Sequence, residues 1–239
     1  LRTFSSGTVT RPVDPEVAAA IRAFAAAHRV THLNVLLAAH FAFLHRATGA
    51  RDLVTGIAAA GQVLDAAPGL VGHCVHILPV RIDAGEDTTF RDLLQAVRNS
   101  MLDAQEHHHT TFGTLLRHLS FPRDPGRVPL APVAFNLDGD PGGVQFSGLA
   151  AVAEFLPRRA EAFEWFINVV ESGPALEVRC AFNSDLRSSE LVEALVDCFL
   201  TVLSGAVHEP DTAIGRLPHH HVGHDGVGRA AGKRRAGAR

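Results

Sequence analysis

The segment HHHVGHDG at residues 219–226 holds the side chains best suited to chemistry in this sequence. His221 offers an imidazole whose ordinary pKa lies near neutrality, and Asp225 offers a carboxylate four residues later. Such an imidazole can act as a general base or acid when its position is fixed. His220 and His224 also have the i, i+4 spacing of a weak metal site. A glycine between them disfavours a helix, and no acid or thiol is held nearby to complete the ligands, so we expect no metal site.

A catalytic loop needs neighbouring elements that aim its side chains, and this segment lacks them. Pro218 precedes it and cannot extend a central strand. The thirteen residues after Gly226 contain no apolar stripe. We therefore expect His221 and Asp225 to belong to a disordered tail, rich in His, Arg and Gly, over residues 218–239. A catalytic His221 is the alternative.

Residues 1–217 have the composition of a folded body. Of the 239 residues, 46% are hydrophobic and 20% are charged, which is enough to bury the core of one domain or two small ones. No run of about eighteen apolar residues occurs and the first residues lack the blocks of a signal peptide, so we expect no membrane segment. Cys74, Cys180 and Cys198 lie far apart without C-x-x-C spacing, and we expect a reducing, cytoplasmic setting.

Charge is divided unevenly along the chain. The formal net charge is −3, and the segment from Gly226 onward is basic and contains no acid. The preceding part is therefore acidic, which argues against a nucleic-acid-binding surface. The sequence also contains no G-x-S-x-G, phosphate-loop or dinucleotide-binding pattern, so common nucleophile and nucleotide chemistries find no support.

Hydrophobic periodicity and turn residues predict a mixture of helices and strands. Three of the helices begin at capping residues, which are Asp14, Thr89 and Ser188. Helices are expected over 14–28, 31–49, 88–107, 111–119 and 188–207, and strands over 52–61, 73–83, 131–139, 149–155, 163–172 and 175–183. The last two strands flank Gly173 and Pro174 and predict a hairpin. This pattern predicts an α/β fold, a two-layer sandwich with a mixed sheet and helices mainly on one face.

Several segments carry a family resemblance. LVGHCVHILPVR is similar to the pattern G-x-F-V-N-T-L-x-x-R, with Gly72, Val75, Leu78 and Arg81 matching. HHHTTF is similar to H-Q-D-Y-P-F, with His107 and Phe112 matching. RDPGRVPL is similar to R-D-x-S-R-N-P-L, with Arg123, Asp124, Arg127, Pro129 and Leu130 matching. In this order, from about Phe4 to Leu217, the chain resembles the C-terminal half of a nonribosomal peptide synthetase condensation domain. These domains belong to the chloramphenicol-acetyltransferase-like, CoA-dependent acyltransferase superfamily.

The resemblance implies a function shared between two halves. Condensation domains join an acyl or aminoacyl thioester on one carrier protein's phosphopantetheine arm to an amine held on another, in a tunnel between similar halves. The H-H-x-x-x-D-G motif belongs to the N-terminal half, so this chain would supply the opposite wall and part of a docking surface. It would be inactive alone in amide or ester formation. The implied partners are carrier proteins and the missing half or adjacent synthetase domains. No cofactor or metal would bind directly, and no nucleic acid or membrane is implied.

Some residues depart from the family pattern, and these departures affect the chemistry of the site and not the fold. His76 replaces an Asn, Cys74 a Phe, and Gln62 stands where an Arg is common. On a strand, His76 and Val80 would share one face, so His76 either lines the tunnel or is a satisfied buried histidine. Trp165 is by default a core aromatic residue, with a tunnel-wall position as the alternative.

Three further interpretations remain open from the sequence. The histidines at 107–109 end a predicted helix, where positive charge is favourable, and a solvated helix terminus is preferred over a metal site. A non-catalytic module that docks carrier proteins or a separate half is the second functional hypothesis. A degenerate remnant, with its half-tunnel face left exposed to water, is the third.

Overall fold

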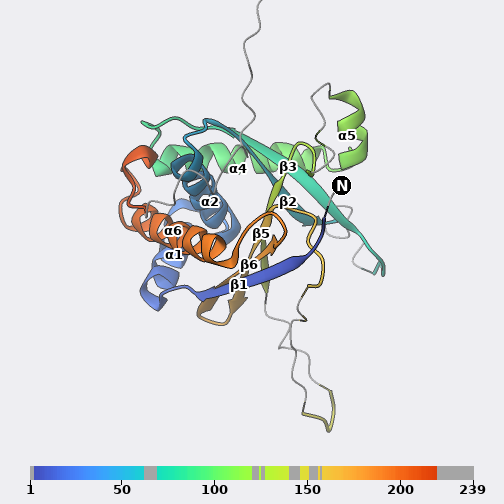
Figure 1. The fold of residues 1–239 in the computed structure, drawn as a ribbon. Coiled ribbons are helices and arrows are strands. Elements are labelled where there is room, and N and C mark those ends of the chain that lie inside the picture. Colours follow the sequence, from blue (N-terminus) through green and yellow to red (C-terminus); the bar gives the residue numbers. More distant parts are fainter. Residues whose placement is uncertain are drawn as a thin grey trace, which may run out of the picture.

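The described chain forms one mixed sheet with most of its helices on one side of it (Figure 1). The computed structural model describes residues 3–61, 69–119, 124, 127–139, 146–150, 156 and 158–219. The six strands lie in the order β1-β6-β5-β4-β2-β3. They are β1 (Ser6–Pro12), β2 (Asp52–Ala60), β3 (Val75–Asp83), β4 (Val133–Gly139), β5 (Trp165–Ser172) and β6 (Ala175–Asn183). The helices are α1 (Pro15–His28), α2 (His32–Thr48), α4 (Phe90–Glu106), α5 (Phe112–His118), α6 (Ser189–His208) and the short 3-10 helix η2 (Ile214–Arg216). The predicted two-layer α/β fold is confirmed.

The sheet combines antiparallel edges with a parallel centre. β4 runs parallel to both of its neighbours, β2 and β5, whereas the pairs β2–β3, β5–β6 and β1–β6 are antiparallel. β5 and β6 form the predicted hairpin. Gly173 at its turn has a φ of 57°, a left-handed conformation that glycine adopts without strain. Parallel pairing requires long connections, so β4 meets strands that are remote in sequence.

The helices begin where the sequence predicts them. The backbone amide of Glu16 donates to Asp14 Oδ1 at 2.8 Å, and that of Asp92 donates to Thr89 Oγ1 at 3.1 Å. Ser188 caps α6 in the same way. Each bond satisfies an amide that has no partner inside its own helix. In Figure 1, α1, α2 and α6 gather on one side of the sheet, and α4 packs beside α2 and β3.

The core lies between the sheet and this helix layer. Alternate residues of the central strands face the helices and are buried, among them Val133, Phe135, Ile167, Val169, Val178 and Phe182. α2 lies at the centre of the layer, and its residues from Val35 to His45 are all buried. A helix buried on every side is expected to be apolar all round, as α2 is. Its buried polar exceptions are His40 and His45.

α6 has the length and hydropathy of a membrane-spanning helix, and it is the one described helix that does. Half of its apolar window is buried inside the fold. Arg11 of β1 pairs with Glu193 and Asp197 on its outer side, at 3.0 Å and 3.1 Å. α6 therefore packs as an amphipathic core helix in this structure.

The sequence pattern does not predict β1. Of the residues in SGTVTRP, Val9 is the one that is buried, so the segment lacks the alternation of a half-buried strand. β1 forms because β6 offers a long edge, and the two pair from Ser6 to Pro12. Gly7 lies over the ring of Phe182, where an added Cβ would come within 2.3 Å. The missing side chain therefore permits the close approach.

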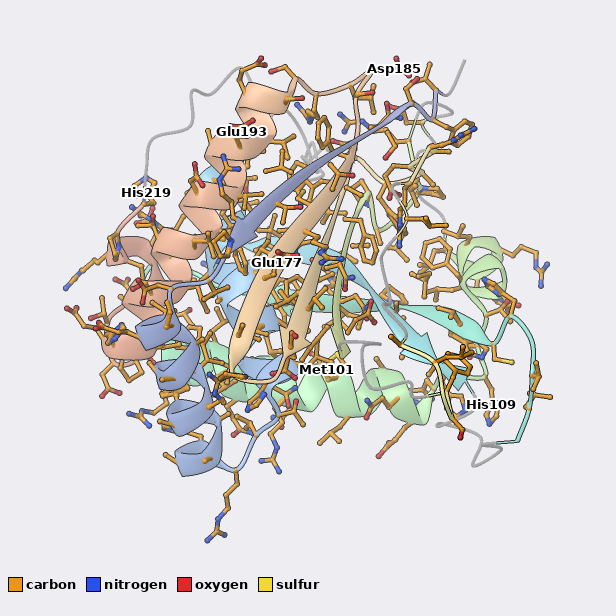
Figure 2. All side chains as sticks on the ribbon, turned by 90° about the horizontal axis from the view of Figure 1, so that it is seen from below. Met101, His109, Glu177, Asp185, Glu193 and His219 are labelled. Atoms are coloured by element: carbon orange, nitrogen blue, oxygen red, sulfur yellow. The ribbon has the colours of Figure 1, made fainter. Side chains whose placement is uncertain are left out.

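The last described residues fold back over the helix layer. Leu217 is buried, and Arg46 of α2 contacts the carbonyl of Gly215 and the ring of His219. Figure 2 shows His219 beside the helices. Residues 220–239, which make up nearly all of the predicted tail, lie outside the described residues. So do residues 151–155 of the strand predicted over 149–155.

Candidate functional site

The face of the sheet that the helices leave uncovered, here called the open face, carries a cluster of polar side chains. Asn136 and Asp138 lie two residues apart on β4, so both point to this face. Asn168 of β5 lies opposite Asn136, and Arg179 of β6 lies opposite Asn168. Glu177, which Figure 2 labels on β6, lies two residues before Arg179 on the same face. These five residues are the open-face cluster.

Three members of the cluster hold one another by hydrogen bonds. Asn136 Nδ2 donates to Asp138 Oδ1 at 2.8 Å and to Asn168 Oδ1 at 3.1 Å. Asn168 Nδ2 donates to Asp138 Oδ2 at 2.9 Å. Both oxygens of Asp138 therefore accept an amide hydrogen, and the carboxylate is held in one orientation. All three side chains are half-buried.

The other charges on the central strands of this face are paired. Arg179 Nε contacts Glu177 Oε1. Arg158 lies 4.6 Å from the centre of the Phe166 ring, which it covers on the open face as a cation–π contact. Among the described residues of β4, β5 and β6, Asp138 is the carboxylate on this face that has no cationic partner. The cluster therefore presents one fixed and uncompensated negative charge.

The resemblance segment at 123–130 is anchored to the start of β5. Glu164 is 3% exposed, and its oxygens lie 3.2 Å from Arg127 Nε and 2.8 Å from Arg187 Nη2. The Glu164 amide donates to the carbonyl of Pro132 at 2.8 Å. A carboxylate this deeply buried requires such partners. Arg127 thus fastens the loop before β4 to the strand beside β4.

The remaining residues of that segment shape the same loop. Asp124 Oδ2 lies 3.8 Å from Arg127 Nε. The carbonyl of Pro129 accepts from the Ala131 amide at 2.8 Å. Leu130 between them has a φ of 66°, a left-handed conformation that is uncommon for a branched residue. Arg123 lies outside the described residues.

The segment at 70–81 runs along β3 at the edge of the sheet. Arg81 points to the open face and makes a two-pronged pair with Asp52 of β2, at 2.7 Å and 2.9 Å. This hydrogen bonding raises the pKa of Arg81 above its ordinary value. Gly72 is exposed ahead of the strand, and Phe112 is half-buried at the first position of α5. The structural roles that the resemblance implies for Gly72 and Phe112 stay predictions.

The two predicted tunnel-wall residues lie on the helix side of the sheet. His76 shares its strand face with the buried Val80, as the spacing predicts, and its ring stands 6.3 Å from that of His108 beyond α4. Trp165 is 2% exposed and packs in the core with Phe43 and Val196. Its core interpretation fits this position, and the tunnel-wall alternative for Trp165 does not. Neither residue joins the open-face cluster.

The histidines at 107–109 are not a uniformly solvated helix end. His108 is buried, and its Nδ1 lies 2.7 Å from the carbonyl of Gln105 in the last turn of α4. Its ring lies 4.0 Å from that of His109, which Figure 2 labels at the end of the molecule opposite His219. In the part of the chain that the structure describes, no three His, Cys, Asp or Glu side chains are grouped as metal ligands. The interpretation as a solvated terminus is therefore corrected for His108.

Sequence reasoning did not find the open-face cluster. Asn136 and Asp138 interrupt the apolar strand AFNLDG at alternate positions, and Asn168 does the same in FINVVES. That spacing was a signal for one shared face, but the parallel pairing of β4 and β5 was needed to bring them together. His221 and Asp225 lie outside the described residues, and the structure leaves their predicted place in a tail untested.

The polar groups of the open face can recognise a ligand by hydrogen bonding. Amide and carboxylate oxygens there accept hydrogen bonds, and the guanidinium groups donate them. No described histidine belongs to the open-face cluster, so the cluster supplies no group with the near-neutral pKa of a general base. The open-face cluster can therefore donate and accept hydrogen bonds, and it holds no imidazole of its own.

Comparison with known proteins identifies the family of this chain. The sequence model of the family described as Condensation domain matches residues 1–221. The nonribosomal peptide synthetase kk1B of Curvularia clavata is 31% identical over 217 residues, which are 89% of this chain and 2% of that synthetase. The chain thus belongs to the condensation-domain family, and it spans a small part of the curated relative that it matches.

Two solved structures share the fold. A four-domain nonribosomal peptide synthetase, holo-AB3403 bound to AMP and glycine, has a TM-score of 0.80 at 20% identity over 90% of this chain and 18% of that one. The condensation domain of the monacolin K polyketide synthase MokA has a TM-score of 0.76 at 21% identity. The match covers 88% of this chain and 49% of MokA's. At these identities the likeness establishes the fold.

Proposed function

We propose that this chain is the C-terminal half of a condensation domain that forms amide bonds, or related ester bonds, in nonribosomal peptide synthesis. One observation carries the proposal: nearly the whole described fold superposes on about half of a condensation-domain chain. The family match over residues 1–221 supports the same assignment. The partner half would carry the catalytic imidazole.

The reaction would take place between the open face and that partner half. The amine nitrogen of one thioester attacks the carbonyl carbon of the other, forming the C–N bond. The C–S bond breaks and the phosphopantetheine sulfur leaves as a thiolate, while the proton lost from the amine passes to the general base and from there to that sulfur. This chain would bind and orient the two arms and exclude water, which favours aminolysis over hydrolysis. The phosphopantetheine belongs to the carrier proteins.

Exposed apolar side chains support a docking role. Val71 and Leu156 are 97% and 86% exposed, and Phe146 and Leu149 are also exposed. Exposed apolar groups of this size favour contact with another protein surface. The three cysteines are in the thiol form, and two of them are buried, which fits a reducing cytoplasmic setting.

The test is a condensation assay on separately purified parts. The chain is supplied with carrier-bound acyl and aminoacyl thioesters, alone and together with the N-terminal half of a condensation domain, and amide product is measured by mass spectrometry. We expect product with both halves and none with the chain alone. Robust turnover by this chain alone that is lost in His221→Ala would overturn the proposal.

A second candidate is a carrier-docking module without catalysis, favoured by the lack of a histidine in the open-face cluster. Titration with a holo carrier protein separates the two. Micromolar binding with no turnover, even after the second half is added, supports the docking module. Failure of the chain to unfold cooperatively would instead favour a degenerate remnant.

A further inference from the structure

The carboxylate of Asp138 is the unusual member of the open-face cluster. A charged group that served sheet stability alone would face a cation on the neighbouring strand. Arg81 and Asp52 show that arrangement on β3 and β2. Asp138 instead faces two amides that donate to both of its oxygens, while its charge stays uncompensated among the described residues. Its environment therefore fixes the orientation of the half-buried carboxylate and leaves its charge available to a cation.

The unused lone pairs of Asp138 and Asn136 indicate what kind of ligand would fit. Each Asp138 oxygen accepts one amide hydrogen and keeps capacity for another. Asn136 uses its Nδ2 as the donor in its hydrogen bonds to Asp138 and Asn168. Its Oδ1 therefore remains as a further acceptor. A primary ammonium group carries three N–H donors and one positive charge, and so matches these acceptors in number and sign. Charge-assisted hydrogen bonds of this kind are the stronger class.

We propose that Asp138, oriented by Asn136 and Asn168, is a recognition site for the protonated amine of an amino-acid-derived substrate. The site discriminates between an acyl group with a free amine and the same group N-acylated. This rests on the proposed function for the identity of the substrate. An N-acylated substrate carries no charge there and leaves Asp138 without its ion pair, which costs affinity.

The test uses the full chain and small probes in solution. Glycinamide, cationic at slightly acidic pH, is titrated while the side-chain amide resonances of Asn136 and Asn168 are followed by NMR. N-acetylglycinamide, which is neutral, is the matched probe. We expect glycinamide to shift both resonances saturably, and N-acetylglycinamide to leave them in place. Asp138→Asn should weaken glycinamide binding by about tenfold or more.

Asp103→Asn is the matched control, because it removes the same charge from an exposed position on α4. It should leave binding unchanged. The proposal is overturned if glycinamide shifts neither resonance, if the shifts persist in Asp138→Asn, or if both probes act alike. None of these readouts needs turnover. A chain that completes a condensation domain but ignores glycinamide would refute the amine site and leave the proposed function standing.

Discussion

His40 gives the sharpest physical prediction, because it is a titratable group sealed inside the core. Its ring is fully buried in α2 and lies among Phe43, Phe135 and Phe199, with the Phe135 ring centre at 5.0 Å. Neither ring nitrogen has a hydrogen-bond partner in the described chain. Desolvation by burial lowers the pKa of His40 from 6.5 to about 3.

The sign and size of the pH effect follow from this pKa. Below pH 6.5 the unfolded chain binds a proton at His40 that the folded chain excludes, so acid destabilises the fold until the pH reaches about 3. The contribution is about 2 kcal/mol between pH 7.5 and pH 5. His40→Leu removes the proton-binding group and two unpaired nitrogens at similar volume. The wild type should therefore lose about 2 kcal/mol relative to His40→Leu over this interval.

Urea unfolding at a series of pH values measures the difference between the two proteins. Its pH dependence isolates His40, because other titrating groups affect both proteins alike. His208→Gln, an exposed substitution at the end of α6, is the control and should show a much smaller change. A wild-type to His40→Leu difference that stays constant from about pH 7.5 to about pH 5 would refute the reasoning.

Two further predictions concern buried polar groups and are measured by the same unfolding experiment. Arg187→Leu leaves Glu164 buried with Arg127 as its remaining partner, and should cost roughly 2–3 kcal/mol. The exposed pair is the comparison, since Arg81→Leu should cost less than about 1 kcal/mol; equal costs would contradict the role of burial. Trp165 carries an indole N–H without a hydrogen-bond partner in the described chain. Trp165→Phe removes that N–H and should cost under about 1.5 kcal/mol, against roughly 3–5 kcal/mol for Trp165→Ala. A Phe variant as unstable as the Ala variant would show that the N–H is satisfied.

Local signals account for the elements that the sequence predicts well. Helices that begin at Asp14, Thr89 and Ser188 carry their capping group next to an apolar stripe, so both signals lie within a few residues of each other. The β5–β6 hairpin is equally local, because its turn residues join strands adjacent in sequence. Because these helices and strands are extensively buried, their apolar patterns identify them without knowledge of the elements they pack against.

Features that depend on remote partners could not be predicted in the same way. β1 is specified by the free edge of β6, which lies far along the chain, and its own residues show one buried position. The open-face cluster depends on the register that sets Asn136 beside Asn168. The side on which Trp165 lies could not be predicted either, because alternation along a strand does not say which face of the sheet the helices cover.

The most direct test of the central claim is to find which face of this chain a second condensation half covers. Hydroxyl-radical footprinting reports the accessibility of individual side chains. Val75, exposed on the open-face side of β3, and Leu102, about equally exposed on α4, are matched probes. Adding an N-terminal condensation half should protect Val75 and leave Leu102 unchanged. Protection of Leu102 with Val75 still reactive would contradict a site shared across the open face.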